Sequence, residues 1–161
     1  MYPCTYKWMP SADQLPKVVD RASIMRLQEA LFEANDGADG LEDFPLTHHF
    51  APEVYGREML LPAGKVIIGK IHRHAHLNII LSGRAVVATE FGRKEVSAGQ
   101  VFVSEPGTKR AVMALEDTRW ITIHPNQSNT QDLSAIENYV IAPSYDALGF
   151  DPQAMKLEAA K

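Results

Sequence analysis

The chain has 161 residues, of which 45% are hydrophobic and 22% are charged, and its formal net charge at pH 7 is −4. This length and composition predict one globular domain with terminal extensions rather than two full domains. The negative charge argues against nucleic acid as the main partner, and no run approaches the roughly 18 apolar residues of a membrane-spanning helix.

The first residues indicate where the protein resides. Residues 1–19 are interrupted by prolines, which predicts an extended segment, and they lack the apolar core of a signal peptide. The only cysteine, Cys4, cannot form an internal disulfide, so nothing indicates an oxidising compartment. A cytoplasmic location is therefore expected.

A helix is predicted over residues 20–34, with Asp20 or Ser23 as its N-cap. We expect its apolar face to pack on the outside of the main domain. The acidic loop at 36–43 lacks the ligand order of a calcium loop, so it is interpreted as a solvated loop. Apolar residues recur at helical spacing in the helix: Ile24, Leu27, Leu31 and Ala34.

Short apolar or alternating segments begin at Arg57, each closed by turn residues, and they predict about eight antiparallel strands. The predicted fold is mainly β, an antiparallel sandwich or barrel with an N-terminal helix and a short C-terminal helix that begins at Pro152. Residues 133–140 are compatible with a short helix or a strand. The predicted strands are 57–61, 66–72, 77–82, 84–91, 94–97, 100–104, 111–115 and 119–124.

Three histidines alternate in the sequence: His72, His74 and His76. The β-branched residues around them favour a strand, on which all three face the same side. Neighbouring histidines would lie roughly 6.6 Å apart and could share one ion, whereas His72 and His76 would be roughly 13 Å apart and could not, unless a bulge bends the chain. A third ligand must come from elsewhere.

His124, at the end of the last predicted strand, is the best candidate for that ligand. His48 and His49 are weaker candidates, and Asn78 could bind through its carbonyl oxygen. Imidazole is a suitable ligand for a divalent transition metal such as Fe, Zn or Ni, with Mn as a further option. The alternative is a polar strand face whose histidines bond to neighbours or water.

The segment from Met59 to His124 resembles the cupin family, a small antiparallel jelly-roll β-barrel. His72 and His74 match the HxH of the first cupin motif, and Gly83 matches its closing glycine. The glutamate of that motif is missing, and His76 occupies the place where it usually stands. The segment also resembles small cupin-like proteins encoded by tailed bacteriophages.

The second cupin motif is only partly present. Gly99 and Gly107 match it, and Pro106 lies one place late. Arg110 stands where the family has a histidine, and Ala114 stands where it has an asparagine. Arginine stays protonated and does not ligate metals, so Arg110 is either a cavity residue that binds an anion or a surface residue paired with an acidic neighbour, Glu105 or Asp117.

The strand pattern that begins at Arg57, together with the resemblance over Met59 to His124, predicts a barrel over 57–124, with extensions at 1–56 and 125–161. The resemblance leaves three functions open, and with them whether the protein is an enzyme. A metal-dependent enzyme acting on a small, anionic molecule would use His72, His74, His76 and His124 as metal ligands, with Arg110, Tyr55 and Glu58 as catalytic candidates.

The second function is a non-catalytic cupin that binds or sequesters a small molecule, with Arg110, Asn78 and His76 as ligand-binding residues. The third is a structural or interaction scaffold. A homo-oligomer, most often a dimer, is expected under all three, in the host cytoplasm if a phage encodes the chain.

Overall fold

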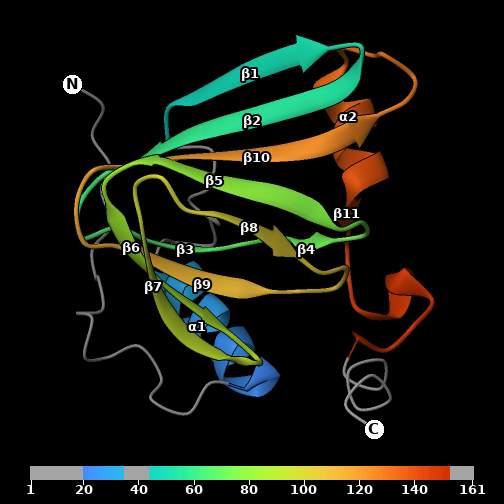
Figure 1. Ribbon diagram of the computed structural model, residues 1–161. Coiled ribbons are helices and arrows are strands. Elements are labelled where there is room, and N and C mark those ends of the chain that lie inside the picture. Colours follow the sequence, from blue (N-terminus) through green and yellow to red (C-terminus); the bar gives the residue numbers. More distant parts are fainter. Residues whose placement is uncertain (1–19, 35–43, 153–161) are drawn as a thin grey trace, which may run out of the picture.

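The computed structural model describes residues 20–34 and 44–152, which form two facing antiparallel sheets (Figure 1). The five-stranded sheet has the order β1-β2-β10-β5-β8, and the four-stranded sheet has the order β3-β9-β6-β7. A two-stranded ladder, β11-β4, lies at one end. The predicted mainly β, antiparallel fold with an N-terminal helix is confirmed, although the two sheets remain separate instead of joining into a closed barrel.

The strands of the five-stranded sheet are β1 (Leu46–Ala51), β2 (Glu53–Leu61), β5 (His76–Ser82), β8 (Val101–Ser104) and β10 (Thr118–Asn126). Those of the four-stranded sheet are β3 (Val66–Ile68), β6 (Arg84–Thr89), β7 (Gly92–Ser97) and β9 (Arg110–Ala114). The short ladder joins β4 (Ile71–His72) to β11 (Ile141–Ala142). The helical elements are α1 (Arg21–Ala34), α2 (Leu133–Val140) and the 3-10 turn η3 (Asp146–Leu148).

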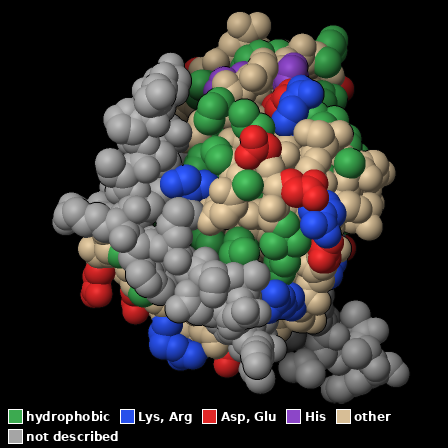
Figure 2. Space-filling model, turned by 90° about the vertical axis from the view of Figure 1, so that its left-hand side faces the viewer, with side chains coloured by type: hydrophobic (Ala, Val, Ile, Leu, Met, Phe, Trp, Pro, Cys, Tyr) green, Lys and Arg blue, Asp and Glu red, His purple; other side chains and the backbone are tan. Residues whose placement is uncertain are grey.

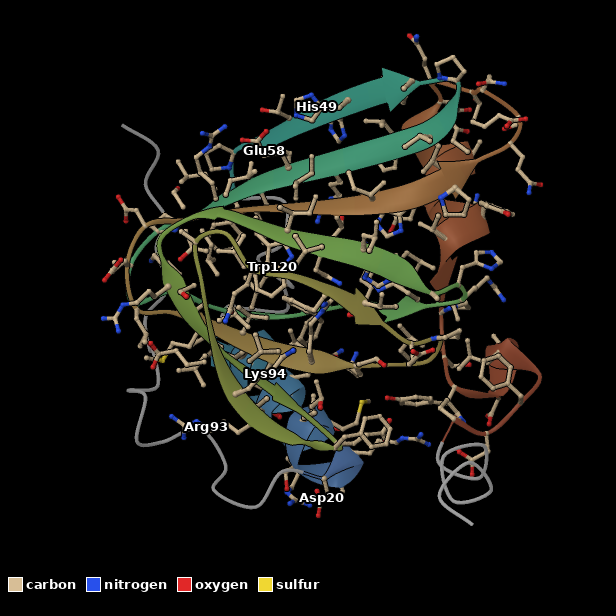
Figure 3. The ribbon with its side chains drawn as sticks, in the orientation of Figure 1. Asp20, His49, Glu58, Arg93, Lys94 and Trp120 are labelled. Atoms are coloured by element: carbon tan, nitrogen blue, oxygen red, sulfur yellow. The ribbon has the colours of Figure 1, made fainter. Side chains whose placement is uncertain are left out.

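The main core lies between the two sheets, where Trp120 stands among the apolar side chains (Figure 3). Its residues alternate along the strands of the five-stranded sheet, as expected for a sheet with one face in the core. Every residue of β9, by contrast, is buried, because α1 covers the outer face of the four-stranded sheet. The core residues are Phe44, Met59, Leu61, Ile67, Ile80, Ala85, Val87, Val96, Val112, Ala114 and Trp120.

Helix α1 packs as the sequence predicts. Ile24 and Leu31 join a second apolar cluster with residues of β3, β6 and β9 on the outside of the four-stranded sheet (Figure 1). The backbone N–H of Ser23 donates to Asp20 Oδ1 at 2.6 Å, so Asp20 is the N-cap. Residues 133–140, for which helix and strand were both open, form α2, capped by Asp132.

Several predicted boundaries differ from the structure. The five-stranded sheet begins at Leu46, so part of the predicted N-terminal extension belongs to it. The predicted strand over 66–72 is interrupted after Ile68 and resumes only as the two residues of β4. The predictions for residues 1–19, the acidic loop at 36–43 and the helix after Pro152 lie outside the described residues. Within the described part of the chain, no helix is long and apolar enough to cross a membrane.

The turn at Gly83 joins β5 to β6 and therefore connects the two sheets. Its φ is +81°, and a Cβ at this position would lie 2.3 Å from the carbonyl oxygen of Asp117. Gly99 has a similar φ of +85°, but no atom lies within 4 Å of its position for a Cβ. The two glycines therefore separate backbone strain from steric conflict.

We expect Gly83→Ala to lower the free energy of unfolding by about 2–5 kcal/mol, because strain and overpacking add. Gly99→Ala should cost only about 1–2 kcal/mol, from backbone strain alone. Urea unfolding at equilibrium measures both values. Equal losses in the two variants would show that the steric conflict with Asp117 does not contribute to the loss of stability in Gly83→Ala.

Candidate functional site

Three histidines from three strands converge at one end of the space between the sheets. His72 lies on β4, His76 opens β5 and His124 lies near the end of β10. One ring nitrogen of each lies within 4.8 Å of the others. The ring centroids of His72 and His76 are 4.1 Å apart, and those of His76 and His124 are 4.7 Å apart. We call these three residues the histidine cluster.

The cluster differs from the pairing that strand geometry predicts. His72 and His76 were expected to lie too far apart on a regular strand, but β4 ends at His72 and the chain bends before β5 begins at His76. The adjacent pair His72 and His74 is therefore not the one that converges. His74 lies in the bend and places its ring 4.7 Å from that of Tyr139 on α2.

Burial keeps the histidine cluster neutral. Desolvation, with a further contribution from the positive charge of Arg110, lowers the pKa of His76 to about 3 and that of His124 to about 4. The pKa of His72 is also well below its ordinary value, mainly through desolvation. Neutral imidazoles carry the lone pairs that metal ions and hydrogen-bond donors require.

Arg110 lies behind the cluster, and the prediction that it could be a surface residue is wrong. Its side chain is buried and donates from Nη1 to Asn78 Oδ1 at 2.8 Å and to Ser104 Oγ at 2.9 Å. Nη2 lies 2.8 Å from Nε2 of His76. Burial lowers the pKa of Arg110 to about 10, so it remains charged at neutral pH.

Asn78, predicted as a ligand through its carbonyl oxygen, holds this arginine instead. Its Oδ1 accepts from Arg110 and, at 3.1 Å, from the indole Nε1 of Trp120. Its amide donates to Ser104 Oγ at 3.0 Å. Asn78 is fully buried, and its oxygen has no capacity left for a ligand.

The imidazole nitrogens of the cluster suit a transition metal, provided that His76 gives up its hydrogen bond with Arg110. Nδ1 of His72 is buried and has no hydrogen-bond partner among the described residues, so an ion could reach it without displacing one. Nε2 of His76 can only accept from the guanidinium of Arg110, which places its proton on Nδ1, 3.3 Å from the carbonyl oxygen of His74. A metal ion therefore meets no competitor at His72 but competes with Arg110 at His76.

A cavity of about 390 Å³ adjoins the cluster, between the inner face of the five-stranded sheet and α2. His72, His124 and Arg110 reach its wall, as do Tyr55 and Arg57 of β2. A larger groove of about 800 Å³ lies between α1 and α2, but the histidine cluster does not line it. The apolar part of the smaller cavity's wall includes Leu46, Met59, Ile67, Val112, Trp120, Leu133, Ile136, Val140 and Ile141.

The catalytic candidates on β2 point in opposite directions because alternate residues face opposite sides. Tyr55 lines the cavity, and its hydroxyl lies 2.8 Å from Nδ1 of His48, which lines it too. Burial raises the pKa of Tyr55. Glu58 lies on the outer face, where its carboxylate binds His49 at 2.9 Å and Arg119 (Figure 3). The expectation that Glu58 reaches the cavity is therefore not met.

The outer face of β1 and β2 carries charged side chains instead of cavity residues. Figure 2 shows histidine beside acidic and basic side chains at the top of the face in view. His49, Glu58 and Arg119 form such a group, with hydrogen bonds between them. The hydrogen bonds to His49 and Arg119 lower the pKa of Glu58, which suits a structural ion pair.

Arg57 is the cavity residue that the sequence analysis did not single out. It faces inward between Tyr55 and Met59. The sequence signal for Arg57 was its alternation with Tyr55 and Met59 along one strand. Because the predicted strand began at residue 57, Tyr55 lay outside it and this alternation was incomplete.

No protein-family model and no curated protein matches this chain. The solved structures that it resembles include proteins described as cupins. A Cupin 2 conserved barrel domain protein from Salinispora arenicola is 16% identical, with a TM-score of 0.47 over 58% of this chain and 85% of that one. KdgF from a Halomonas species is 21% identical, with a TM-score of 0.46 over 53% and 83%. A cupin-2 domain protein from Shewanella frigidimarina is 14% identical, with a TM-score of 0.44 over 51% and 80%. Likenesses of this size carry nothing about ligand or reaction.

The neutral histidines predict that acid destabilises the protein. Below about pH 6.5 these histidines are protonated in the unfolded chain but stay neutral in the folded chain. Stability therefore falls with pH until the folded pKa values are reached, about 4 for His124 and about 3 for His76. Urea unfolding with a chelator present should show losses of up to about 1.4 kcal/mol per pH unit for each histidine between about pH 6.5 and about pH 4.

The matched variants are His124→Gln, which should reduce this slope, and His49→Gln, which should leave it unchanged because His49 lies on the outer face. A stability that stays constant from about pH 7 to about pH 5 would contradict the neutral state of the cluster.

Asn78→Leu should cost about 3–5 kcal/mol, because it removes an acceptor shared by the buried guanidinium of Arg110 and the indole N–H of Trp120. Asn138→Leu on the exposed side of α2 is the control, with an expected change within about 0.5 kcal/mol. Chemical denaturation measures both. A loss near that of Asn138→Leu would mean that Arg110 does not depend on Asn78.

Proposed function

We propose that the protein holds a divalent transition metal with His72, His76 and His124 and acts on a small anionic molecule in the adjoining cavity. One observation carries the proposal: three imidazoles from separate strands, two of them buried and that of His72 half-buried, converge within 4.8 Å at a cavity of about 390 Å³. A cavity of this volume is in the range of small-molecule sites.

The charges around the cluster support both parts of the proposal. All three imidazoles are neutral, as ligation requires. No carboxylate belongs to the cluster within the described segments, so an ion bound there would keep its full positive charge. Arg57 and Arg110 add to the positive potential of the cavity, which favours an anion as its occupant.

The residues of the chain have distinct roles in this proposal. Arg110 fixes the tautomer of His76 and holds its ring against the cluster. Tyr55 and His48 are hydrogen-bonded to each other at the cavity wall, where the Tyr55 hydroxyl is within reach of a ligand. The metal, when bound, supplies Lewis acidity, and the apolar wall excludes water.

The test is metal stoichiometry. We expect the purified chain, dialysed against Zn²⁺, Ni²⁺ or Fe²⁺, to retain about one ion per chain by elemental analysis. His72→Ala and His124→Ala should each weaken binding by about tenfold or more, because each removes a ligand. His74→Ala is the matched control, since His74 lies outside the cluster.

Equal effects of His74→Ala and His72→Ala would contradict the assignment of ligands. A chain that retains no transition metal under any of these conditions would contradict the metal site. Only the binding of a small anionic molecule in the cavity would then remain of the proposal.

A second candidate is a non-catalytic protein that binds or sequesters its small molecule. The hydrogen bond between Arg110 and His76 favours it, because that bond already satisfies one member of the cluster without a metal. Native mass spectrometry of freshly purified protein, before and after denaturation, tests this candidate: a stoichiometric organic molecule that is released unchanged supports it.

Membership of the cupin superfamily, a phage origin, a cytoplasmic location and a homodimer belong to the same proposal. Their support is the pattern of the sequence, together with the antiparallel fold.

A further inference from the structure

Three basic side chains line the cavity beside the histidine cluster, and they differ in how they are bonded. Lys70 forms an ion pair with Glu137 of α2. Arg110 donates to three neighbouring side chains. The guanidinium of Arg57 makes no hydrogen bond and no ion pair with any residue in the described segments 20–34 and 44–152.

The sheet register fixes where Arg57 lies. Its partners on the neighbouring strands are His48 of β1 and Thr122 of β10. The next inward-facing row toward the cluster is Tyr55 beside His124. Arg57 is therefore one row from a member of the histidine cluster, on the same face of the sheet.

The charge of Arg57 acts on the cavity. Desolvation lowers the pKa of Arg57, and its charge contributes to the lowered pKa values of His72 and His124. Glu137, the acidic group that acts on it from α2, has its carboxylate paired with Lys70. A largely buried guanidinium with free N–H groups and no paired carboxylate is costly unless a bound group supplies the counter-charge.

We propose that Arg57 binds the carboxylate of a small monocarboxylate whose apolar body lies against α2 and the inner face of the five-stranded sheet. A guanidinium binds a carboxylate through two parallel hydrogen bonds, and one free guanidinium matches one negative charge. The body of the ligand is apolar because the rest of the wall is, with Leu46 and Met59 on the sheet side and Leu133, Ile136 and Val140 on α2.

This inference rests on the proposed function only in taking the cavity as the binding site, and it names the class of molecule. A phosphate ester carries close to two charges at neutral pH and is therefore the alternative that the experiment has to distinguish.

The experiment is calorimetric titration of the full, chelator-treated chain with aliphatic and aromatic monocarboxylates, their matched primary amides and the corresponding phosphate monoesters. We expect carboxylates to bind at least about tenfold more tightly than their amides, the difference expected for hydrogen bonds to a charged group. Arg57→Gln should abolish that preference, and Arg57→Lys, which keeps the charge without the two-pronged geometry, should retain part of it.

The matched control is Arg119→Gln, because Arg119 lies on the outer face and pairs with Glu58. It should leave carboxylate affinity within about twofold. Circular dichroism and thermal unfolding establish that each variant is folded, and Arg57→Lys provides the measurement if Arg57→Gln is not.

Three results would overturn the inference: amides that bind as tightly as carboxylates, phosphate esters that bind more tightly than carboxylates, or no carboxylate that binds at millimolar concentration. Repeating the titration with Zn²⁺ separates the two proposals. A preference for carboxylates that is lost in the Arg57 variants without metal supports this inference even if no metal binds. If the chain binds Zn²⁺ but its carboxylate affinity is the same in the Arg57 variants, this inference alone is overturned.

Discussion

The buried guanidinium of Arg110 is the group on which the rest of the interior depends. Arg110 belongs to β9 of the four-stranded sheet, and its acceptors Asn78, His76 and Ser104 belong to β5 and β8 of the other. A charge buried in this way is stable only while its acceptors are in place. The distance between the sheets, the orientation of the His76 ring and the wall of the cavity are therefore set together.

The same charge explains the chemistry of the site. Burial, together with this cation, disfavours protonation of the histidines, so the neutral rings of His72 and His124 can present lone pairs to the cavity. Arg57, on the five-stranded sheet, adds a second positive charge at the cavity wall. The two fixed cations favour an anionic ligand over a cationic organic one.

Much of the fold could be predicted from alternation and capping. Residues 119–124 alternate, and they form most of β10; Asp20 precedes the apolar helical pattern, and it caps α1. The interruption of the strand at Gly69 was not predictable from the alternation of residues 66–72; in the structure the Gly69 N–H donates to the carbonyl oxygen of Arg110 at 2.8 Å, and a Cβ at Gly69 would lie 3.2 Å from Cγ of Arg110. Three of the four predicted metal ligands, His72, His76 and His124, come together in the structure, whereas His74 does not. Regular strand spacing allowed only adjacent histidines to share an ion, and the bend between β4 and β5 removes that limit.

His72 differs from the other two histidines in what holds it. Among the strands of the described segments, β4 pairs with β11 alone, through two residue pairs, and Arg73 donates from Nε to the carbonyl oxygen of Ile141 at 2.9 Å. Short ladders of this kind open locally at a lower free energy than the sheets behind them. A ligand that joins His72 to His124 would lower the population of the open form by mass action. Amide hydrogen exchange would then slow together at residues 71–73 and 141–142, which are far apart in the chain. Occupancy of the site can therefore be followed by backbone exchange without knowledge of the ligand.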